Sequence, residues 1–440
     1  MIEKLFKLQQ HQTTAKTEIT AGLTTFFTMA YILVVNPLIL SKTGMNFNAV
    51  MVATAITAII GTLLMSLLAN LPIAVAPGMG LNAFFAYSIV MGMGYSWQFA
   101  LTAVFLEGIL FIILSLLNIR EAIINSIPAD IKKAISVGIG LFIALIGLVN
   151  AGIIETGMFV GNNKLDGVIV KLGNIKSAAS IIVFIGLFVS AALMFKKVNA
   201  ALFIGIIVAT IIGIPLGLTH LPKFQNIISL PPSLAPVFLK IEFSKIFSWN
   251  MLIILFTLLS VNVFDTVGTL IGCCSAGNLL DKDGKIPNAK KALLADAIAT
   301  TSAACLGSSV ATAYIESASG IASGGKTGLT ALTVSGMFFL SLFFAPLLSI
   351  IPAAATSPAL IIVGLLMLKE IQKIDFSDIT NALPAFLTII IMPFTYSIAE
   401  GIVFGMISFV VLKLISGKHK EVNTTMYVLA FLFVISIIIK

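Results

Sequence analysis

PIAVAPGMGLNAFFAY (residues 72–87) is too short and too rich in glycine and proline to be an ordinary membrane helix. A second stretch, SSVATAYIESASGIASGG (residues 308–325), has the same character and carries small polar residues where apolar ones are usual. Backbone that leaves the helix at membrane depth is tolerated only where it is buried in protein or lines a cavity. We therefore expect two interrupted membrane segments that together enclose a polar site.

The composition of the chain places both stretches in a membrane. The 440 residues are 59% hydrophobic and only 10% charged, whereas soluble proteins carry about 25% charged residues. Apolar runs of about 20 residues, which are long enough to span a bilayer, recur throughout. The sequence thus predicts an all-α, multi-pass protein of the cytoplasmic membrane. The net charge of +8 fits the Lys and Arg that gather in cytoplasmic loops, and we expect no binding of nucleic acid.

Fourteen apolar segments fall into two sets of seven. They lie near 19–40, 49–71, 73–91, 97–118, 131–152, 177–195 and 200–219, and then near 249–275, 289–307, 308–322, 327–350, 353–369, 379–396 and 398–415. With the N-terminus inside, the inside connections hold 18 Lys and Arg and the outside ones hold 7, leaving Lys440 aside. This bias predicts that both ends are cytoplasmic.

The expected divisions of the chain follow from these segments. They are an interfacial N-terminal segment (1–18), a first repeat (19–219), an extracellular connection (220–248), a second repeat (249–415) and a tail (416–440). The tail contains a last apolar stretch, 424–439, which is short for a span and fits the membrane interface as well.

Three similarities in sequence relate the two sets of segments. FTMAYIL (27–33) resembles FDTVGTL (264–270), Ile-Pro-Ala occurs at 127–129 and again at 351–353, and both third segments are interrupted. Because seven is an odd number, two such repeats must insert with opposite topology. Inverted repeats with interrupted helices at matching positions are typical of secondary transporters, which bind substrate near the midplane.

One motif suggests another function. GIASGGKT (320–327) fits the phosphate-binding pattern G-x-x-x-x-G-K-[ST], but that pattern needs a preceding strand and a following helix in a soluble unit. Here it closes an interrupted membrane segment and leads into another apolar span. We expect the glycines to provide a sharp turn and Lys326 to lie at the cytoplasmic surface.

Four acids fall inside apolar segments: Glu107, Asp265, Asp296 and Glu316. A charged side chain at the bilayer centre costs about 2.5–3.5 kcal/mol on insertion scales. We therefore expect each acid to have a functional role or a structural partner. For Asp296 we expect a structural salt bridge near the interface, since Lys290 and Lys291 precede it. Glu107 has no polar neighbour in sequence, and we expect a partner on another helix.

Asp265 and Glu316 are the better candidates for function. Asp265 lies among Asn262, Thr266 and Thr269, and Glu316 lies where the tenth segment changes conformation. Two carboxylates at one site suit a neutral ligand with N–H donors and C=O acceptors, because one accepts from the ligand while the other carries a proton.

In the third segment, Asn82 offers donors and an acceptor suited to a purine edge; satisfying loose backbone ends is the competing interpretation. Four aromatic residues are placed to stack on a planar ligand, although packing is the commoner role for such residues: Phe84, Phe85, Tyr87 and Phe264.

Several long motifs, in order over nearly the whole chain, closely resemble the AzgA-type purine permeases of the second nucleobase–cation symporter family. They are TTFFTMAYILVVNPLIL (24–40), LPIAVAPGMGLNAFFAY (71–87), FDTVGTLIG (264–272), KKALLADAIATT (290–301), YIESASGIASGGKTGLTA (314–331) and IIPAAATSPALIIVG (350–364). The resemblance implies proton-coupled uptake of hypoxanthine, guanine or adenine. It also implies a core domain (segments 1–4 and 8–11) that moves against a gate domain (segments 5–7 and 12–14), with short strands in segments 3 and 10.

The resemblance also implies a binding site. The acids that bind the base in relatives match Asp265 and Glu316, and the polar residue of segment 3 matches Asn82. The full set of candidate substrate-binding residues is Asp265, Glu316, Asn82, Thr28, Phe264, Ile315 and Gly80, with Asp265 and Glu316 also coupling protons. The chain departs from the family pattern at Asn262, where many relatives carry an acid, and at Lys326, where arginine is commoner.

The expected partners are a purine base, a proton, membrane lipid and a second copy of the chain, with no cofactor or metal. The three cysteines, Cys273, Cys274 and Cys305, form neither a disulfide framework nor a metal motif. Other interpretations remain open, namely a permease for uracil or xanthine, an anion exchanger of the related sulfate-transporter fold, a channel and an intramembrane enzyme. Two carboxylates disfavour an anion site, and no span offers the histidine or paired catalytic residues of an enzyme.

Overall fold

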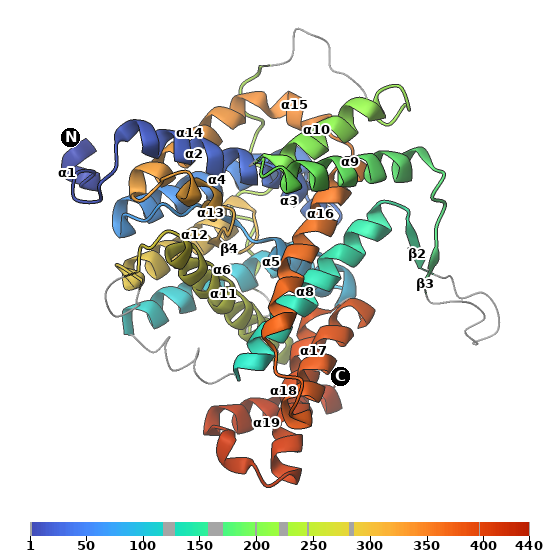
Figure 1. The fold of residues 1–440 in the computed structure, drawn as a ribbon. Helices are drawn as coiled ribbons and strands as arrows, with labels where there is room; N and C mark the ends of the chain where they lie inside the picture. Colours follow the sequence, from blue (N-terminus) through green and yellow to red (C-terminus); the bar gives the residue numbers. More distant parts are fainter. Residues whose placement is uncertain are drawn as a thin grey trace.

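The computed structural model is almost entirely helical (Figure 1). It describes residues 2–117, 128–156, 170–198, 200–219, 228–243, 246–280, 286–395 and 397–439. Among these residues, nine helices are long and apolar enough to cross a membrane. The chain is therefore an integral, multi-pass membrane protein, as its composition predicts.

The first half of the chain contains nine α-helices, two π-helical turns and three short strands among its described elements. In order they are α1 (Ile2–Phe6), α2 (Ala15–Met29), α3 (Ile32–Ser41), α4 (Phe47–Leu64), η1 (Met65–Ala69), β1 (Val75–Pro77), α5 (Met79–Ala83), η2 (Phe84–Gly92), α6 (Trp97–Leu117), α8 (Ala129–Asn150), β2 (Ile154–Thr156), β3 (Val170–Leu172), α9 (Ala178–Phe195) and α10 (Ala201–Gly213), where α2 and α3 form one bent segment.

The second half begins with the longest helix. Its elements are α11 (Trp249–Ala276), α12 (Ala289–Leu306), β4 (Ala311–Ala313), α13 (Ser317–Ala322), α14 (Gly328–Ser341), η4 (Leu342–Phe344), α15 (Ala345–Ser349), α16 (Ala353–Leu368), η5 (Lys369–Lys373), α17 (Ile379–Thr395), α18 (Ile398–Ile415), η6 (His419–Glu421) and α19 (Thr424–Ile439). Each of the fourteen predicted apolar segments contains helix. The stretch 424–439 is a single helix, α19, that packs on α18.

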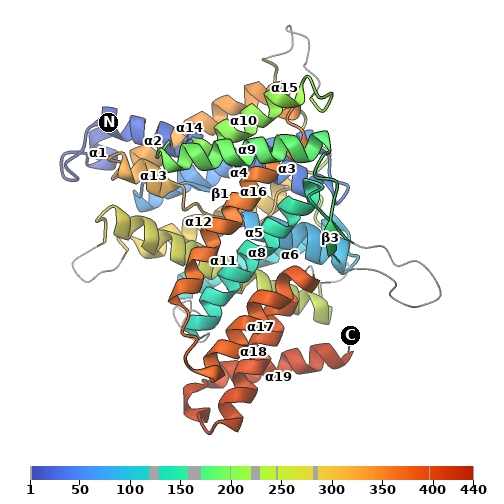
Figure 2. The ribbon, with the colours of Figure 1, turned by 45° about the vertical axis from the view of Figure 1, so that its right-hand side comes forward.

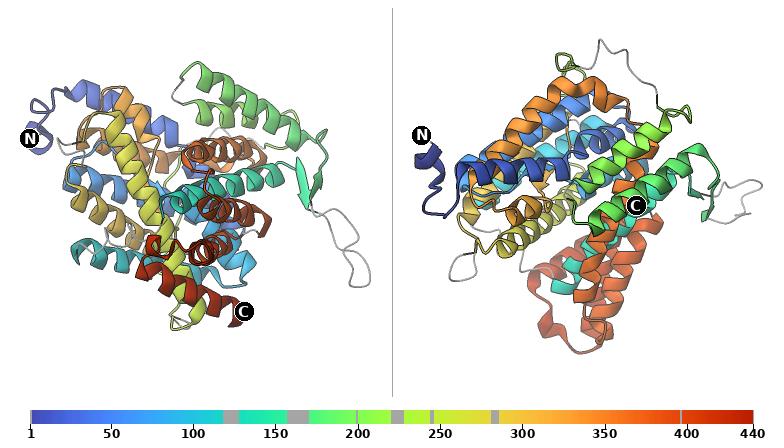
Figure 3. Two further views of the ribbon diagram at one scale, coloured as in Figure 1. Left: turned by 60° about the horizontal axis from the view of Figure 1, so that its bottom comes forward. Right: turned by 45° about the horizontal axis from the view of Figure 1, so that its top comes forward.

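Helices from the two halves of the sequence lie side by side in two sets (Figures 1 and 2). In the first set, α2 and α4 pack against α14, and α4 and α6 pack against α12. In the second set, α8 packs against α16 and α17, and α9 packs against α10 and α16. The second set also includes α18 and α19, which lie together at one end of the molecule (Figure 3). The fold thus mixes the two halves of the chain rather than separating them.

The two interrupted stretches meet as a small antiparallel sheet. Strand β1 pairs with β4 so that Val75 lies opposite Ala313 and Pro77 opposite Ala311. All six strand residues are buried. Two threonines from neighbouring helices complete the hydrogen bonding: Thr62 accepts from the Val75 N–H, and Thr300 donates to the Ala311 carbonyl. Such pairing satisfies backbone groups that have no access to water.

Because the strands are antiparallel, the helices that follow them leave the pair in opposite directions. Helix α5 begins two residues after β1, and α13 begins four residues after β4. The N-termini of both short helices therefore lie at the strand pair, on opposite sides of it. This is the arrangement of broken helices that secondary transporters use to bind substrate.

The structure adds two features that the sequence does not predict. A second small sheet pairs β2 with β3, between α8 and α9, which an all-α prediction omits. In the connection 220–248, of which 228–243 and 246–248 are described, Val237 is fully buried against Gly307. That part of the connection therefore packs on the first helix set.

An ion pair ties the ends of α17 and α18 together outside the membrane-spanning segments. The Lys418 Nζ atom lies 2.6 Å from Asp378 Oδ2. Hydrogen bonding to this ammonium holds the pKa of the Asp378 carboxyl well below its usual value. The adjoining Glu421 lies within 2.5 Å of Lys413, which is buried at the end of α18.

The motif GIASGGKT, which resembles a phosphate-binding loop, binds a carboxylate of the same chain. The carboxylate of Glu18, fully buried on α2, accepts from the backbone N–H groups of Lys326 (3.0 Å) and Thr327 (3.2 Å). It also accepts from the Thr330 hydroxyl at 2.6 Å. Gly324 turns the chain with a φ of 101°, a conformation that favours glycine. The motif therefore joins α2 to α14.

We expect Glu18→Ala to destabilise the protein by about 2–3 kcal/mol, because it removes charge-assisted hydrogen bonds and leaves buried N–H donors without a partner. Lys326→Ala is the matched control, because the contact to Glu18 uses only the backbone of Lys326. The measurement is the thermal midpoint of the purified protein in detergent. A larger loss for Lys326→Ala than for Glu18→Ala would contradict this role.

Candidate substrate site

Glu316 lies at the turn between β4 and α13. Its carboxylate Oε1 accepts a hydrogen bond from the Tyr31 hydroxyl at 2.6 Å. Tyr31 lies in the break between α2 and α3 and is 1% exposed. Glu316 itself is half-buried. A carboxylate has acceptor sites on both oxygens, so Glu316 can bind Tyr31 and a ligand at the same time.

Asp265, in the middle of α11, approaches the same segment from another direction. Its Oδ2 atom lies 3.4 Å from the hydroxyl of Thr312, a residue of β4 four positions before Glu316. Helix α11 packs against both β4 and α13, and Asp265, like Glu316, is half-buried. The structure therefore brings the two acids, 51 positions apart in the sequence, to one short stretch of chain.

Thr28 and Ile315 belong to the same region. The Thr28 hydroxyl lies 3.0 Å from the hydroxyl of Ser319, and Ser319 donates to the backbone carbonyl of Glu316 at 2.7 Å. Ile315 is 51% exposed although it adjoins buried Tyr314. An exposed apolar side chain next to a half-buried carboxylate offers a surface for a planar, apolar-faced ligand.

Gly80 and Asn82 lie on α5, at the opposite side of the strand pair. A Cβ atom on Gly80 would lie 2.7 Å from Ile139 of α8, so the glycine permits the close approach of the second helix set. Asn82 is fully buried, and its carbonyl oxygen accepts from Ser309. Within the described residues, the Asn82 amide nitrogen has no hydrogen-bond partner. Asn82 therefore keeps a donor available, away from Glu316.

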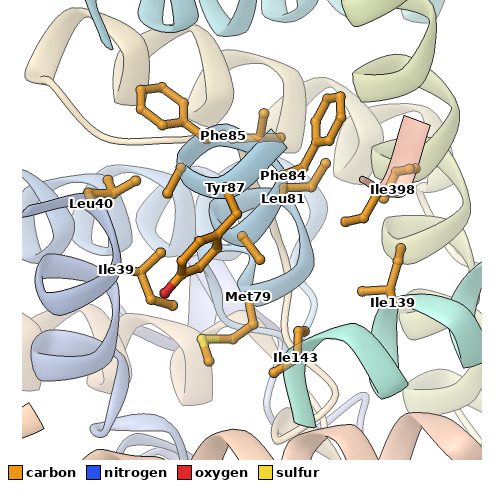
Figure 4. Close-up of a cluster of buried hydrophobic side chains, with 14 of the residues drawn as sticks. Ile39, Leu40, Met79, Leu81, Phe84, Phe85, Tyr87, Ile139, Ile143 and Ile398 are labelled. Carbon is orange, nitrogen blue, oxygen red and sulfur yellow. The ribbon is translucent and has the colours of Figure 1, made fainter. Parts of the chain in front are cut away.

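The aromatic residues of segment 3 pack in the core, the role that we consider commoner for them. Phe84 and Phe85 are fully buried in the cluster shown in Figure 4. Tyr87 makes an edge contact with Phe142, and the Lys42 Nζ atom lies 5.6 Å from its ring centre. The side chain of Phe264 lies outside the described part of the structure.

The expected salt bridge of Asp296 near the interface stays a prediction, and the structure adds a contact that the sequence did not predict. Asp296 is fully buried and accepts from the Thr266 hydroxyl at 2.9 Å, whereas Lys290 is exposed and donates to the Leu116 carbonyl. Glu107 does pair with another helix, as expected: it accepts from the Asn262 amide nitrogen at 2.9 Å. Both acids thus face buried polar residues of α11.

The sequence-based search missed Tyr31 and Thr312. Nothing distinguishes Tyr31 from the apolar residues around it, except that a tyrosine hydroxyl buried in a membrane segment needs a partner. Thr312 is one of many small polar residues in its stretch. Its contact with Asp265 depends on strand β4, which pairs with residues 75–77, far away in the sequence.

Chemically, the site offers carboxylate acceptors and hydroxyl groups at the meeting point of interrupted helices. No cluster of three or more His, Cys, Asp or Glu that could hold a metal occurs among the described residues. Interrupted helices that meet in this way are typical of secondary transporters.

Comparison with known proteins gives the family. The model of a permease family, Xan_ur_permease, matches residues 16–404, and the chain belongs to that family. The resemblance to purine permeases is confirmed by full-length relatives. A guanine/hypoxanthine permease of Bacillus subtilis, PbuO, is 46% identical, with 99% of this chain and 100% of the relative covered. An adenine permease of Escherichia coli, AdeP, is 41% identical over 100% of this chain and 96% of the relative.

A solved structure supports the fold. The transmembrane domain of a cyanobacterial bicarbonate transporter, BicA, is similar with a TM-score of 0.64. The match covers 90% of this chain and 97% of that domain at 15% sequence identity. At this identity the similarity concerns the fold alone.

Proposed function

We propose that this protein carries purine nucleobases, such as hypoxanthine, guanine or adenine, into the cell by proton symport. The observation that carries the proposal is the pair of half-buried acids, Glu316 in the turn between β4 and α13 and Asp265 beside β4. A neutral base presents N–H donors that such acceptors bind well. The names of the relatives, which are guanine/hypoxanthine and adenine permeases, support the same substrate class.

The proposed mechanism is alternating access. The base binds between α13 and α5, where Glu316, Asp265, Thr28 and Ile315 lie on one side and Gly80 and Asn82 on the other. One of the two acids carries the proton, which lowers the cost of moving charge through the membrane. We propose that the first helix set is the core that moves and the second is the gate, with fourteen segments arranged as two inverted repeats.

The contacts between helices support this division. Segments 1–4 and 8–11 contribute the first set, and segments 5–7 and 12–14 the second. The boundary passes between Gly80 and Ile139, where the two sets touch. Cytoplasmic termini, lipid contacts on the outer apolar surface and a dimer of two copies complete the proposal.

An anion exchanger is the principal alternative, because the bicarbonate transporter shares the fold. A site for an anion presents positive groups, whereas this one presents two carboxylates. A permease for uracil or xanthine differs from our proposal only in the base, which the same uptake assay identifies.

The test is uptake of radiolabelled hypoxanthine, guanine and adenine by a host that lacks purine transport. We expect at least one base to accumulate, about tenfold faster at external pH 5.5 than at pH 8, and a protonophore to abolish the accumulation. Uptake of bicarbonate or sulfate in place of any base, or accumulation that is independent of pH, would overturn the proposal.

A further inference from the structure

A third carboxylate lies deep in the first helix set. Glu107 is in the middle of α6, ten residues from Trp97 at its start and ten from its last residue, and it is fully buried. Its Oε1 atom accepts from the Asn262 amide nitrogen at 2.9 Å. Asn262 is likewise fully buried on α11, one turn before Thr266.

A continuous chain of polar contacts leads from this pair to the proposed substrate site. The Asn262 carbonyl oxygen lies 3.2 Å from the Thr266 hydroxyl, and that hydroxyl lies 3.0 Å from the hydroxyl of Thr312. Thr312 in turn approaches Asp265 at 3.4 Å. Asp296 joins the chain from the side, at 2.9 Å from Thr266. Three side chains, those of Asn262, Thr266 and Thr312, thus connect Glu107 with Asp265.

The direction of the hydrogen bonds along this chain depends on the charge of Glu107. A hydroxyl has one proton to donate, and an amide has a donor end and an acceptor end. Ionised Glu107 requires the donor end of Asn262, so the acceptor end faces Thr266. Neutral Glu107 donates a proton of its own to the acceptor end, and the donor end then faces Thr266. The Thr266 hydroxyl then no longer donates to Asn262; its one proton goes to Asp296 or to Thr312, and Thr312 can donate to Asp265.

The titratable groups around Glu107 belong to the elements that pack against α6. Helices α11 and α12 and the π-helical turn η2 pack against α6. Their acids, Asp265 and Asp296, belong to the same chain of contacts, and η2 contributes Tyr87. Cys273 and Cys274 lie further along α11, and Cys305 near the end of α12.

The basic residues of these elements are Lys290 and Lys291, at the exposed start of α12. Lys290 reaches the Leu116 carbonyl, nine residues or about 13 Å along α6 from Glu107. At the other end of α6, the Glu242 carboxylate accepts a hydrogen bond from the Ser96 hydroxyl. Several acids in one buried region cannot all be charged without large cost.

We propose that Glu107 is a second proton-binding carboxylate of the transport cycle, connected to Asp265 through Asn262, Thr266 and Thr312. The inference rests on the proposed proton symport. The proton comes from the medium on one side, forms the O–H bond of neutral Glu107, and returns to the medium on the other side. No proton passes through the Asn262 amide, which only changes the end that it presents. Glu107 therefore couples transport to the proton gradient and does not contact the base.

The test separates coupling from binding in proteoliposomes loaded with the full-length protein. Counterflow, the exchange of radiolabelled for unlabelled base without a proton gradient, measures binding and movement. Accumulation driven by a pH gradient measures coupling. The probe is whichever of hypoxanthine, guanine and adenine the wild type exchanges fastest. For Glu107→Gln we expect counterflow within about twofold of wild type, accumulation reduced at least tenfold, and a flattened pH profile.

Two further variants sharpen the test. Asn262→Leu keeps Glu107 but breaks its connection, and we expect the same loss of accumulation; this variant decides the matter if Glu107→Gln does not fold. Thr257→Val is the matched control, because Thr257 is a buried threonine of α11 that donates to the Ile253 carbonyl, and we expect no change.

The possible outcomes are distinguishable. Normal gradient-driven accumulation by Glu107→Gln or by Asn262→Leu would overturn the role of Glu107 while leaving proton symport intact. Equal loss of counterflow and accumulation would assign Glu107 a structural role. If the wild type exchanges base but does not accumulate it under a pH gradient, the proposed symport itself fails.

Discussion

Replacing Glu316 by glutamine is expected to lower base uptake about 100-fold or more, and Asp265→Asn to do the same. Each substitution puts an amide where a carboxylate accepts hydrogen bonds. A hydrogen bond to a charged group contributes about 1.5–3 kcal/mol, and the upper value corresponds to roughly 100-fold in affinity. Neither amide can carry a proton, so accumulation is lost as well. The measurement is initial uptake of radiolabelled base in a host that lacks purine transport.

Tyr31→Phe is the graded comparison for this prediction. It removes the donor 2.6 Å from Glu316 but keeps the carboxylate, so we expect a loss of about five- to tenfold. The amount of each variant in the membrane fraction is the control for folding. Uptake at wild-type rates by both Glu316→Gln and Asp265→Asn would show that the base binds elsewhere.

A substitution that does not touch the ligand is expected to have the second largest effect. Gly320 is on α13, four residues after Glu316, and faces α2. A Cβ atom there would lie 2.1 Å from the Thr25 hydroxyl oxygen and 2.5 Å from the Ala21 carbonyl oxygen. Overpacking of this kind typically costs 1–3 kcal/mol. Because the backbone of α2 cannot easily move to relieve this clash, we expect α13 to shift in Gly320→Ala.

A shift of α13 would move Glu316 away from Tyr31. Displacements of about 1 Å at a binding group can cost up to 100-fold in rate, so we expect Gly320→Ala to reduce uptake between 10- and 100-fold. Gly336→Ala on α14 is the matched control, because nothing lies within 4 Å of a Cβ atom there. Equal uptake by the two variants, at equal amounts in the membrane, would contradict the importance of this close approach.

The sequence predicted the parts of the molecule that depend on local composition. Apolar runs predicted a multi-pass protein, in which nine described helices are long and apolar enough to cross a membrane. The glycine- and proline-rich stretches located the two breaks. The cost of burying charge singled out Glu316 and Asp265, which the structure brings to one strand. The context around GIASGGKT excluded a nucleotide site, although no sequence signal shows that Glu18 fills its loop from more than 300 positions away.

The features that were missed depend on pairing between distant residues. Asp296 has two lysines one or two turns before it, which favour an ion pair at the interface; only the packing of α12 on its neighbours shows that its carboxylate lies against Thr266. Tyr31 meets Glu316 because the bend between α2 and α3 faces α13. The roles of Gly80 and Asn82 likewise depend on how α5 meets α8 and Ser309, and no local pattern encodes those contacts.

The pairing of β1 with β4 has a consequence for synthesis of the protein. Val75 and its partner Ala313 are 238 positions apart, so at about 5–20 residues per second a ribosome needs roughly 10–50 s to deliver the second strand after the first. During that interval the polar backbone of β1 lacks the partner that it has in the finished fold. The first half of the chain therefore lacks this part of its structure until the second half is made. Two halves expressed as separate chains should each be degraded alone and survive together.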